Sequence, residues 1–305
     1  MKDNPIVSAC LIVYNQVDFV KECIEGALKQ QIDYSYEIVI GDDHSTDGTH
    51  EVCNAYAQKH PNLIRYYKRE KNLGMVSNWA ETIGNCEGKY IAICEGDDYW
   101  TDPHKLQTQF NYMESHPNCA FCFHKVKELD ADGVHEDKLN VQHKEQFHLN
   151  DILNKNYAHT PSIMFRADQL TIPCFFYNAM PGDHTLQCIL LRNGGYAFYM
   201  KEAMAVYRKH EGGIWSSDGG KKFAVERAIT KINLYNYLNI TDEKIVDNPY
   251  YMLADFFAKN GYSKMSFFNY YKLLLNHFGW IALFSRKKIY LFHPRTVYLL
   301  KKLIG

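Results

Sequence analysis

The chain has 305 residues, enough for one large α/β domain with an extension or for two modest domains, and 46% of them are apolar. The formal net charge is -1, but residues 261–305 hold eight Lys or Arg and no acid, so the rest of the chain is near -9. No stretch reaches the ~18 uninterrupted apolar residues of a transmembrane helix. The composition therefore predicts a globular protein that does not span a membrane.

Strand and helix patterns alternate through the first hundred residues. Continuous β-rich runs predict buried strands, and apolar residues at helical spacing predict the helices between them. The predicted strands are 6–14, 36–43, 63–69 and 89–98, and the predicted helices are 17–31, 46–60 and 75–86. This rhythm is typical of crossover units that form a parallel sheet with both faces covered. Ligands of such sheets bind beyond the carboxyl ends of the strands.

Acidic residues follow the last of these strands in the segment "CEGDDYW". Glu95, Asp97 and Asp98 stand so close together that each raises the cost of ionising the next. A divalent cation would relieve this repulsion, and carboxylate oxygens favour Mg²⁺ or Mn²⁺ over zinc. A solvated turn is the alternative interpretation of the segment when it is taken alone.

A second acidic pair favours the ligand site over the solvated turn. Asp42 and Asp43 end another predicted parallel strand, so both polar clusters fall at the same edge of the sheet. Carboxylates at strand ends can accept hydrogen bonds from a base or from ribose hydroxyls. The turn residues that follow, "HSTD", also suit the cap of the next helix, and both readings can hold together.

The remainder of the chain is less regular. Patterns predict a helix over 105–116, strands over 119–129 and 159–167, a helix over 179–195 and a helical region after residue 213. We expect one domain over 1–215, made of two halves, 1–105 and 106–215, followed by a helical extension over 216–305.

The nine cysteines do not suggest a disulfide framework. They sit singly inside apolar segments and no secretory signal opens the chain, so we expect reduced core residues in the cytoplasm. Cys119 and Cys122 have the spacing of a metal pair, but "NCAFCFH" is an apolar strand without a second pair of ligands. A zinc site is therefore not expected.

Four segments together resemble the family 2 glycosyltransferases, which have the nucleotide-diphospho-sugar transferase or GT-A fold. They are "VSACLIVYNQVDFVKECIEGALKQ", "YEIVIGDDHSTDGT", "NLGMVSNWAETIGNCEGKYIAICEGDDYW" and "GDHTLQCIL", in that order. The resemblance is close over about residues 5–105 and looser over 155–215. It implies an α/β fold of the GT-A type, a UDP-sugar donor and Mn²⁺ or Mg²⁺ as cofactor.

The resemblance also implies roles for residues of the first half. Asp43 would read the base, usually uracil, and Asp98 would be the direct ligand of the metal ion, while Asp97 faces the ribose or sugar. Glu95 departs from the commoner Asp and is either functional or part of the pocket wall. The other residues expected around the nucleotide are Val13, Tyr14, Asp42, Asn72, Gly74 and Asn78.

The acceptor side is expected to come from the second half. In the family the general base is an acid that opens a helix, and here Asp183 of "PGDH" takes that place, with a plain helix cap as the alternative. Gly182 stands where many members have an acid. His184 could orient the acceptor. His210 of "VYRKHEGGIWS" is a candidate third metal ligand, the alternative being a solvated loop histidine.

Three further side chains are candidates for substrate contacts. Arg166 and Arg208 could meet phosphate oxygens, since guanidinium groups match them bidentately. Surface ion pairs with the acidic body are the alternative for both. Trp215 could stack on a sugar from a loop that closes over the donor.

The basic, aromatic segment 261–305 suits contact with an anionic membrane surface. A helix packed on the catalytic domain or on a second subunit is the alternative. Nucleic acid is not expected as a partner, since the acidic body would repel it. We expect a cytoplasmic protein that can lie at the inner face of the cell membrane.

The leading hypothesis is a metal-dependent, inverting glycosyltransferase that moves a sugar from a UDP-sugar to a saccharide or lipid-linked glycan acceptor in surface polysaccharide biosynthesis. A nucleotidyltransferase that makes sugar nucleotides is less favoured, because no Gly-rich, basic loop for a triphosphate follows "LIVYN". A non-catalytic sugar-nucleotide or glycan binding module is the third hypothesis, and intact Asp43, Asp97, Asp98 and Asp183 disfavour it.

Overall fold

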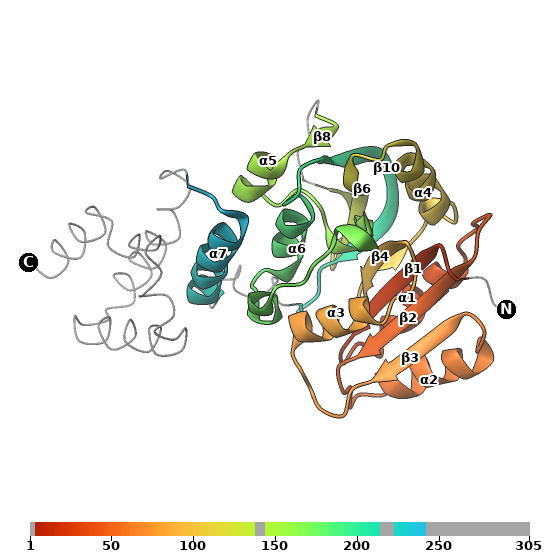
Figure 1. Ribbon diagram of the computed structural model, residues 1–305. Coiled ribbons are helices and arrows are strands. Elements are labelled where there is room, and N and C mark those ends of the chain that lie inside the picture. Colours follow the sequence, from red (N-terminus) through yellow and green to blue (C-terminus); the bar gives the residue numbers. More distant parts are fainter. Residues whose placement is uncertain (1–3, 138–143, 214–222, 242–305) are drawn as a thin grey trace, which may run out of the picture. The chain divides into compact units, whose positions relative to one another are not determined.

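The computed structural model describes residues 4–137, 144–213 and 223–241 (Figure 1). The chain divides into two compact units, Met1–Gly220 and Lys221–Gly305. The first unit carries the sheet, and in the second the structure describes one helix, α7 (Ala224–Leu238). The predictions for the basic segment 261–305 and for Trp215 lie outside the described residues.

The first half of the sheet is parallel, as predicted. Its order is β3 (Ile64–Lys68), β2 (Tyr36–Asp42), β1 (Val7–Val13) and β4 (Tyr90–Glu95). The central strand β1 is buried at every position, as the uninterrupted apolar run requires of a strand covered on both faces. In the register of these strands Val13 pairs with Asp42 and Ile12 pairs with Glu95. The polar residues at the ends of β1, β2 and β4 therefore lie along one edge.

The second half of the sheet is mixed in direction. A short strand, β9 (Met164–Arg166), runs antiparallel between β4 and β6 (Cys119–Asp130), and β10 (Tyr196–Arg208) runs parallel to β6. The edge strand β5 (Tyr99–Trp100) pairs with the end of β10. Two further short strands are β7 (Gly133–Glu136), which pairs with β6, and β8 (Gln146–Phe147), which pairs with β10. The β5–β10 pairing brings the segment after Arg208 beside the acidic motif of residues 95–98.

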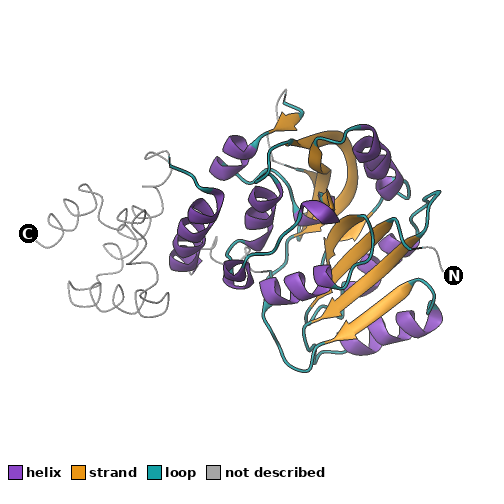
Figure 2. Cartoon of the chain, viewed as in Figure 1, coloured by secondary structure: helices purple, strands orange, loops and turns teal. Residues whose placement is uncertain are grey.

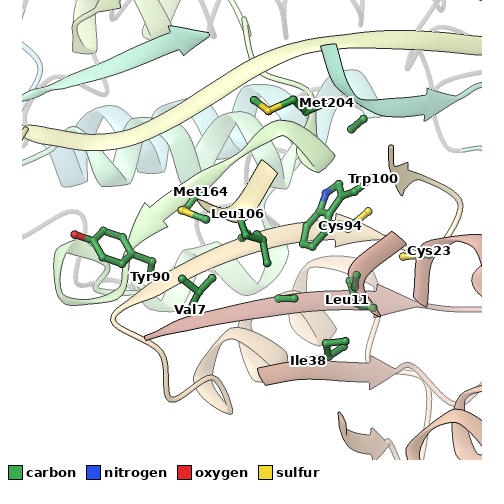
Figure 3. Packing of buried hydrophobic residues seen from close by; sticks show 14 of the residues in the cluster. Val7, Leu11, Cys23, Ile38, Tyr90, Cys94, Trp100, Leu106, Met164 and Met204 are labelled. Carbon is green, nitrogen blue, oxygen red and sulfur yellow. The ribbon is translucent and has the colours of Figure 1, made fainter. Parts of the chain in front are cut away.

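Helices pack on both faces of the sheet (Figure 2). One face is covered by α1 (Val20–Leu28), α2 (Thr49–Lys59) and α4 (Lys105–Ser115), whose apolar side chains join one large cluster with the odd-numbered residues of β1. Figure 3 shows this cluster, with labelled residues that include Leu11, Cys23, Ile38, Cys94 and Leu106. The helices α3 (Met75–Gly84) and α6 (Gly182–Leu190) contact β2 and β6, and their residues are not part of that cluster.

The irregular elements differ from the sequence prediction where proline intervenes. The predicted strand over 159–167 opens with a short 3₁₀ helix, Thr160–Ser162, before β9, because Pro161 has no amide for a sheet ladder. The predicted helix over 179–195 begins only at Gly182, after Pro181, and ends at Leu190. A further helix, α5 (Leu149–Asn154), and two short 3₁₀ helices, Ala167–Gln169 and Cys174–Asn178, complete this part.

The nine cysteines are all free thiols, and Cys119 and Cys122 are buried in β6. Burial raises the pKa of both thiols, so neither is a ready thiolate ligand. Within the described ranges every helix is too short or too polar to cross a bilayer.

Candidate active site

Hydrogen bonds join the two loops that follow β1 and β2 at the carboxyl edge of the sheet. The backbone of Asn15 donates to Ser45 Oγ over 2.9 Å, and the backbone of Thr46 donates to Asn15 Oδ1 over 2.9 Å. Asn15 has φ of 50°, a left-handed conformation that Asn tolerates better than most residues. Val13 is buried at the strand end, whereas 47% of the Tyr14 side chain is exposed. These bonds hold the Tyr14 side chain at the rim of the edge.

Both carboxylate oxygens of Asp42 accept hydrogen bonds from other residues of this edge. Its Oδ1 accepts hydrogen bonds from the backbone and the hydroxyl of Ser45, at 2.9 and 2.6 Å, and its Oδ2 accepts from Tyr66 Oη at 2.6 Å. The carboxylate is fully buried. A buried carboxylate with three donors is well stabilised, so Asp42 fixes the turn beside Asp43.

Asp43 anchors the loop that precedes α3. Its two carboxylate oxygens accept from the backbone N–H groups of Leu73 and Gly74, over 2.7 and 2.9 Å. Burial raises the pKa of Asp43, and the two backbone donors oppose that rise. Gly74 has φ of +90°, which favours glycine at this point. Asn72 lies in the same loop, and its Oδ1 accepts from the Gly74 amide at 3.1 Å.

Asn78 lies deeper than a pocket wall would require. Only 1% of it is exposed, and its Nδ2 donates to the Gly41 carbonyl over 2.8 Å. Its Oδ1 accepts from Arg69 Nε over 3.0 Å. Asn78 therefore ties α3 to the end of β2 and supports this edge of the sheet, and contact with a nucleotide stays a prediction.

Asp98 is the most enclosed acid of the "EGDD" motif. Its Oδ1 accepts from the backbone N–H of Arg208 over 2.7 Å, while its buried Oδ2 has no hydrogen-bond partner among the described residues. Burial raises the pKa of Asp98 well above its usual value, and the charge of Asp97 adds to that rise. A buried carboxylate oxygen without a donor fits a site that a cation completes.

Asp97 faces His210 across the edge. His210 Nε2 and Asp97 Oδ2 are 3.0 Å apart, although 113 positions separate the residues in the chain. The histidine ring also lies 4.8 Å from the ring of Phe19, which limits its orientations. An imidazole nitrogen beside a carboxylate oxygen is a common pair of metal ligands. The geometry thus offers Asp97 as a ligand beside the predicted Asp98, and both assignments stay predictions.

Glu95 joins these acids to the second half of the chain. Burial raises the pKa of Glu95 to about 8, and the charges of Asp97 and Asp183 add to the rise, while a hydrogen bond from Thr160 opposes it. Burial also raises the pKa of Tyr207, and the next causes are the charges of Glu95, Asp98, Asp97 and Asp183. All four acids therefore belong to one group around the ends of β4 and β10.

Asp183 enters this group from the first turn of α6. Its Oδ2 accepts a hydrogen bond of 2.6 Å from Asn156 Nδ2. The neighbouring Gly182 is buried, and a Cβ there would lie 3.0 Å from Val76 Cγ2, so a larger side chain at this position would be crowded. His184 lies on the same turn and its Nε2 is 2.5 Å from the Ile152 carbonyl, which ties the helix start to α5.

The sequence matches the profile described as glycosyl transferase family 2 over residues 8–169, more than half of the chain. The chain belongs to glycosyl transferase family 2. Asp42, Asp43, Glu95, Asp97, Asp98 and Thr160 all lie within the matched residues. The resemblance stated from the sequence motifs is therefore confirmed.

Relatives in sequence match about two thirds of this family 2 chain. An uncharacterized protein of Mycobacterium tuberculosis is 35% identical over 214 residues, which are 69% of this chain and 61% of that protein. The chain thus spans about three fifths of the length of this relative. The putative teichuronic acid biosynthesis glycosyltransferase TuaG of Bacillus subtilis is 28% identical over 209 residues, 67% of this chain and 79% of that protein.

Solved structures confirm the predicted GT-A type of fold. S. aureus TarS 1-349 in complex with UDP-GlcNAc has a TM-score of 0.60 at 17% identity, covering 98% of this chain and 80% of that one. The mannosyltransferase PcManGT of Pyrobaculum calidifontis, in complex with GDP-Man and Mn²⁺, has a TM-score of 0.53 at 16% identity, with 98% and 86% covered. At these identities the likeness shows the fold alone.

A second group of ligand-type side chains lies elsewhere in this family 2 chain. Glu128, Asp137 and His159 each offer one ligand atom, and these atoms lie within 4.8 Å of one another, so they could hold a metal ion. Lys209 Nζ lies 2.7 Å from Glu128 Oε2 and already neutralises that carboxylate. None of the three residues is among the predicted metal ligands.

The prediction that Arg166 meets phosphate was wrong. Its guanidinium donates to Tyr90 Oη over 2.7 Å and to the Cys119 carbonyl over 3.2 Å, at the start of β4 and therefore at the opposite end from Glu95. Arg208 instead lies near the acidic group, where its side chain pairs with Glu22 and packs 4.5 Å from the Phe19 ring. Ion pairing, the alternative given for Arg208, is what the structure contains.

Sequence reasoning missed three residues of the site. Thr160 lies in the short 3₁₀ helix before β9 and Tyr207 lies in β10, and only the long-range packing of these elements brings them near the acids. Asn156 lies in a connection whose sequence, "NKNYAH", carries no periodic signal. Thr160 lies within the predicted strand over 159–167, and nothing local distinguishes its hydroxyl from that of an ordinary turn residue.

Proposed function

We propose that this chain transfers a sugar from a nucleotide-sugar donor, a UDP-sugar, to a glycan or lipid-linked saccharide. One observation carries the proposal: after β4, Asp98 Oδ1 accepts from the backbone N–H of Arg208 and Asp97 Oδ2 lies 3.0 Å from His210 Nε2, while the charge of Asp183, at the start of α6, acts on Glu95. These acids offer ligands for a cation on one side and a carboxylate base on the other. Membership of family 2 supports the same reaction.

The donor nucleotide would bind along the edge formed by β1 and β2. The exposed Tyr14 lies at the rim, and Asp43 holds the loop of Asn72 and Gly74 in place. A carboxylate oxygen has more than one lone pair, so Asp43 can accept from a base N–H while it keeps its backbone donors. This arrangement supports recognition of uracil by Asp43, with Asn78 fixing the floor.

Asp97, Asp98 and His210 would hold the metal ion. The unpartnered Oδ2 of Asp98 and the 3.0 Å approach of Asp97 to His210 fit a hard divalent cation such as Mn²⁺ or Mg²⁺. When bound, such an ion stabilises the negative charge of a departing diphosphate. The mutual repulsion of the acids also makes the edge electrostatically ready for a cation.

Asp183 would act as the general base. One oxygen of its carboxylate is held by Asn156, and the other can accept the proton of the acceptor hydroxyl. A single displacement with a base opposite the leaving group inverts the anomeric carbon. The proposed reaction is therefore inverting, as the resemblance to the family implied.

The name of the Bacillus subtilis relative, a putative teichuronic acid biosynthesis glycosyltransferase, supports a role in surface polysaccharide biosynthesis. Acceptors of that class would reach the enzyme at the inner face of a membrane. Contact of residues 261–305 with anionic lipid, and an oligomeric state, stay predictions from the sequence.

The test is a panel of nucleotide sugars with release of the nucleoside diphosphate as readout. Wild type should turn over at least one UDP-sugar, and Asp183→Asn should lose ~100-fold or more of that rate while it still binds UDP. Asp33→Asn, an exposed control, should behave as wild type. Full activity of Asp183→Asn would refute the base, and formation of pyrophosphate from UTP and a sugar phosphate would favour a nucleotidyltransferase instead.

A further inference from the structure

Asn156 holds the base of the proposed reaction in a fixed hydrogen-bonded arrangement. Its Nδ2 lies 2.6 Å from Asp183 Oδ2, and its Oδ1 accepts from the backbone N–H of Ala158 over 3.2 Å. Gln187 Nε2 also donates to Asn156 Oδ1, over 2.9 Å. Three groups from two segments thus surround one side-chain amide.

The orientation of the Asn156 amide follows from chemistry alone. A backbone N–H can only donate, so the Asn156 atom that faces Ala158 must be the oxygen. The nitrogen of the amide is therefore the atom that faces Asp183. One oxygen of the Asp183 carboxylate is thereby fixed by a donor, and the other stays able to accept a hydrogen bond.

Gln187 is oriented by the same logic. Its Nε2 is 3.2 Å from the carbonyl of Ala158, which can only accept, so the nitrogen of the Gln187 amide must face that way. The same nitrogen donates to Asn156 Oδ1. Gln187 is fully buried on α6, one turn after Asp183, so the helix that carries the base also carries the residue that orients its donor.

We infer that Asn156 is a positioning residue that presents Asp183 to the acceptor hydroxyl, and that Gln187 fixes Asn156 for this purpose. The inference rests on the proposed function, because it assigns a role within that reaction. With Oδ2 occupied by Asn156, the carboxylate has a defined rotation and directs Oδ1 to the acceptor. An Asp held this way loses little orientation when the acceptor binds.

Asn156→Asp is the sharpest test, since it keeps the shape and the acceptor oxygen but replaces the donor with a second acceptor. The expected result is a kcat at least tenfold lower, with the KM for donor and the affinity for UDP unchanged. The matched control is Asn111→Asp, the same chemical change on the exposed face of α4, which should leave kcat unchanged. A wild-type kcat in Asn156→Asp would overturn the inference.

A thermal unfolding cycle tests the contact without any transfer assay. Asn156→Asp should lower the unfolding midpoint, because two carboxylates then face each other, and adding Asp183→Asn should restore most of it through the reversed hydrogen bond. Transfer in the double variant should stay as low as in Asp183→Asn although its stability returns, which separates positioning from stability. Failure of wild type to turn over any nucleotide sugar would refute the proposed function, whereas an unrestored midpoint would refute the Asn156–Asp183 pair.

Discussion

Lys105 is a buried ammonium group beneath the acidic motif, and it allows a quantitative prediction. None of its surface is exposed, its Nζ donates to Gln109 Oε1 over 2.6 Å, and it lies 4.3 Å from the centre of the Trp100 ring. Burial lowers the pKa of Lys105 from 10.5 to about 7. At ~1.4 kcal/mol per pH unit, that gap corresponds to a cost of roughly 5 kcal/mol for folding with Lys105 protonated.

The sign of the pH dependence follows from the direction of this shift. The unfolded chain binds more protons than the folded chain between about pH 7 and 10.5, so stability rises with pH across that window. The free-energy cost of burying protonated Lys105 is fully present below about pH 7 and is absent above the pKa that Lys105 has in the unfolded chain. Lys105→Met removes the charge but forfeits the contacts with Gln109 and Trp100, worth together about 2–3 kcal/mol. We expect a net gain of ~2 kcal/mol at pH 6.

Urea unfolding of both proteins at pH 6 and pH 8.5 measures this directly. The advantage of Lys105→Met over wild type should shrink by about 2 kcal/mol between the two pH values, because wild type recovers part of its cost. Both proteins share the nine cysteines, so thiol titration cancels in the difference. Lys29→Met, at the exposed residue that follows α1, should show no such pH-dependent difference. A variant less stable than wild type by the same amount at both pH values would refute the reasoning.

Three shorter predictions concern the edge of the sheet. A Cβ at Gly96 would lie 2.4 Å from Gln16 Oε1 and 2.7 Å from Val13 Cγ1, so Gly96→Ala should displace this edge and weaken UDP binding about tenfold by calorimetry, an effect of ~1.4 kcal/mol. Tyr66→Phe removes the donor to Asp42 Oδ2 and should lower the free energy of unfolding by about 1–3 kcal/mol in urea. Chelation with EDTA should abolish sugar transfer and added Mn²⁺ should restore it; undiminished transfer in EDTA would contradict the metal site.

The parallel half of the fold was predictable because the local sequence pattern is sufficient to identify each strand. The runs that became β1 and β4 are apolar at all but one position each, and the centre of β2, residues 38–40, is apolar as well, as strands buried on both faces require. Their acidic ends then had to share one edge. The contribution of residues 42–43 and 95–98 to a common site followed from this topology.

The second half was less predictable because its site residues depend on long-range pairing. His210 meets Asp97 only through the pairing of β5 with β10, which local patterns do not specify. Asn156 meets Asp183 through a connection without periodicity. The error over Arg166 has the same origin, since the antiparallel insertion of β9 places that residue at the start of β4 rather than at its end.

The central claim is that the acidic edge binds a nucleoside diphosphate together with a divalent cation. Calorimetric titration of UDP with and without Mn²⁺, in wild type, Asp97→Asn and Asp98→Asn, tests it most directly. We predict that Mn²⁺ strengthens UDP binding to wild type and that at least one variant loses this dependence while its unfolding midpoint is retained. UDP binding that is absent under every condition, or that Mn²⁺ strengthens equally in all three proteins, would contradict the account.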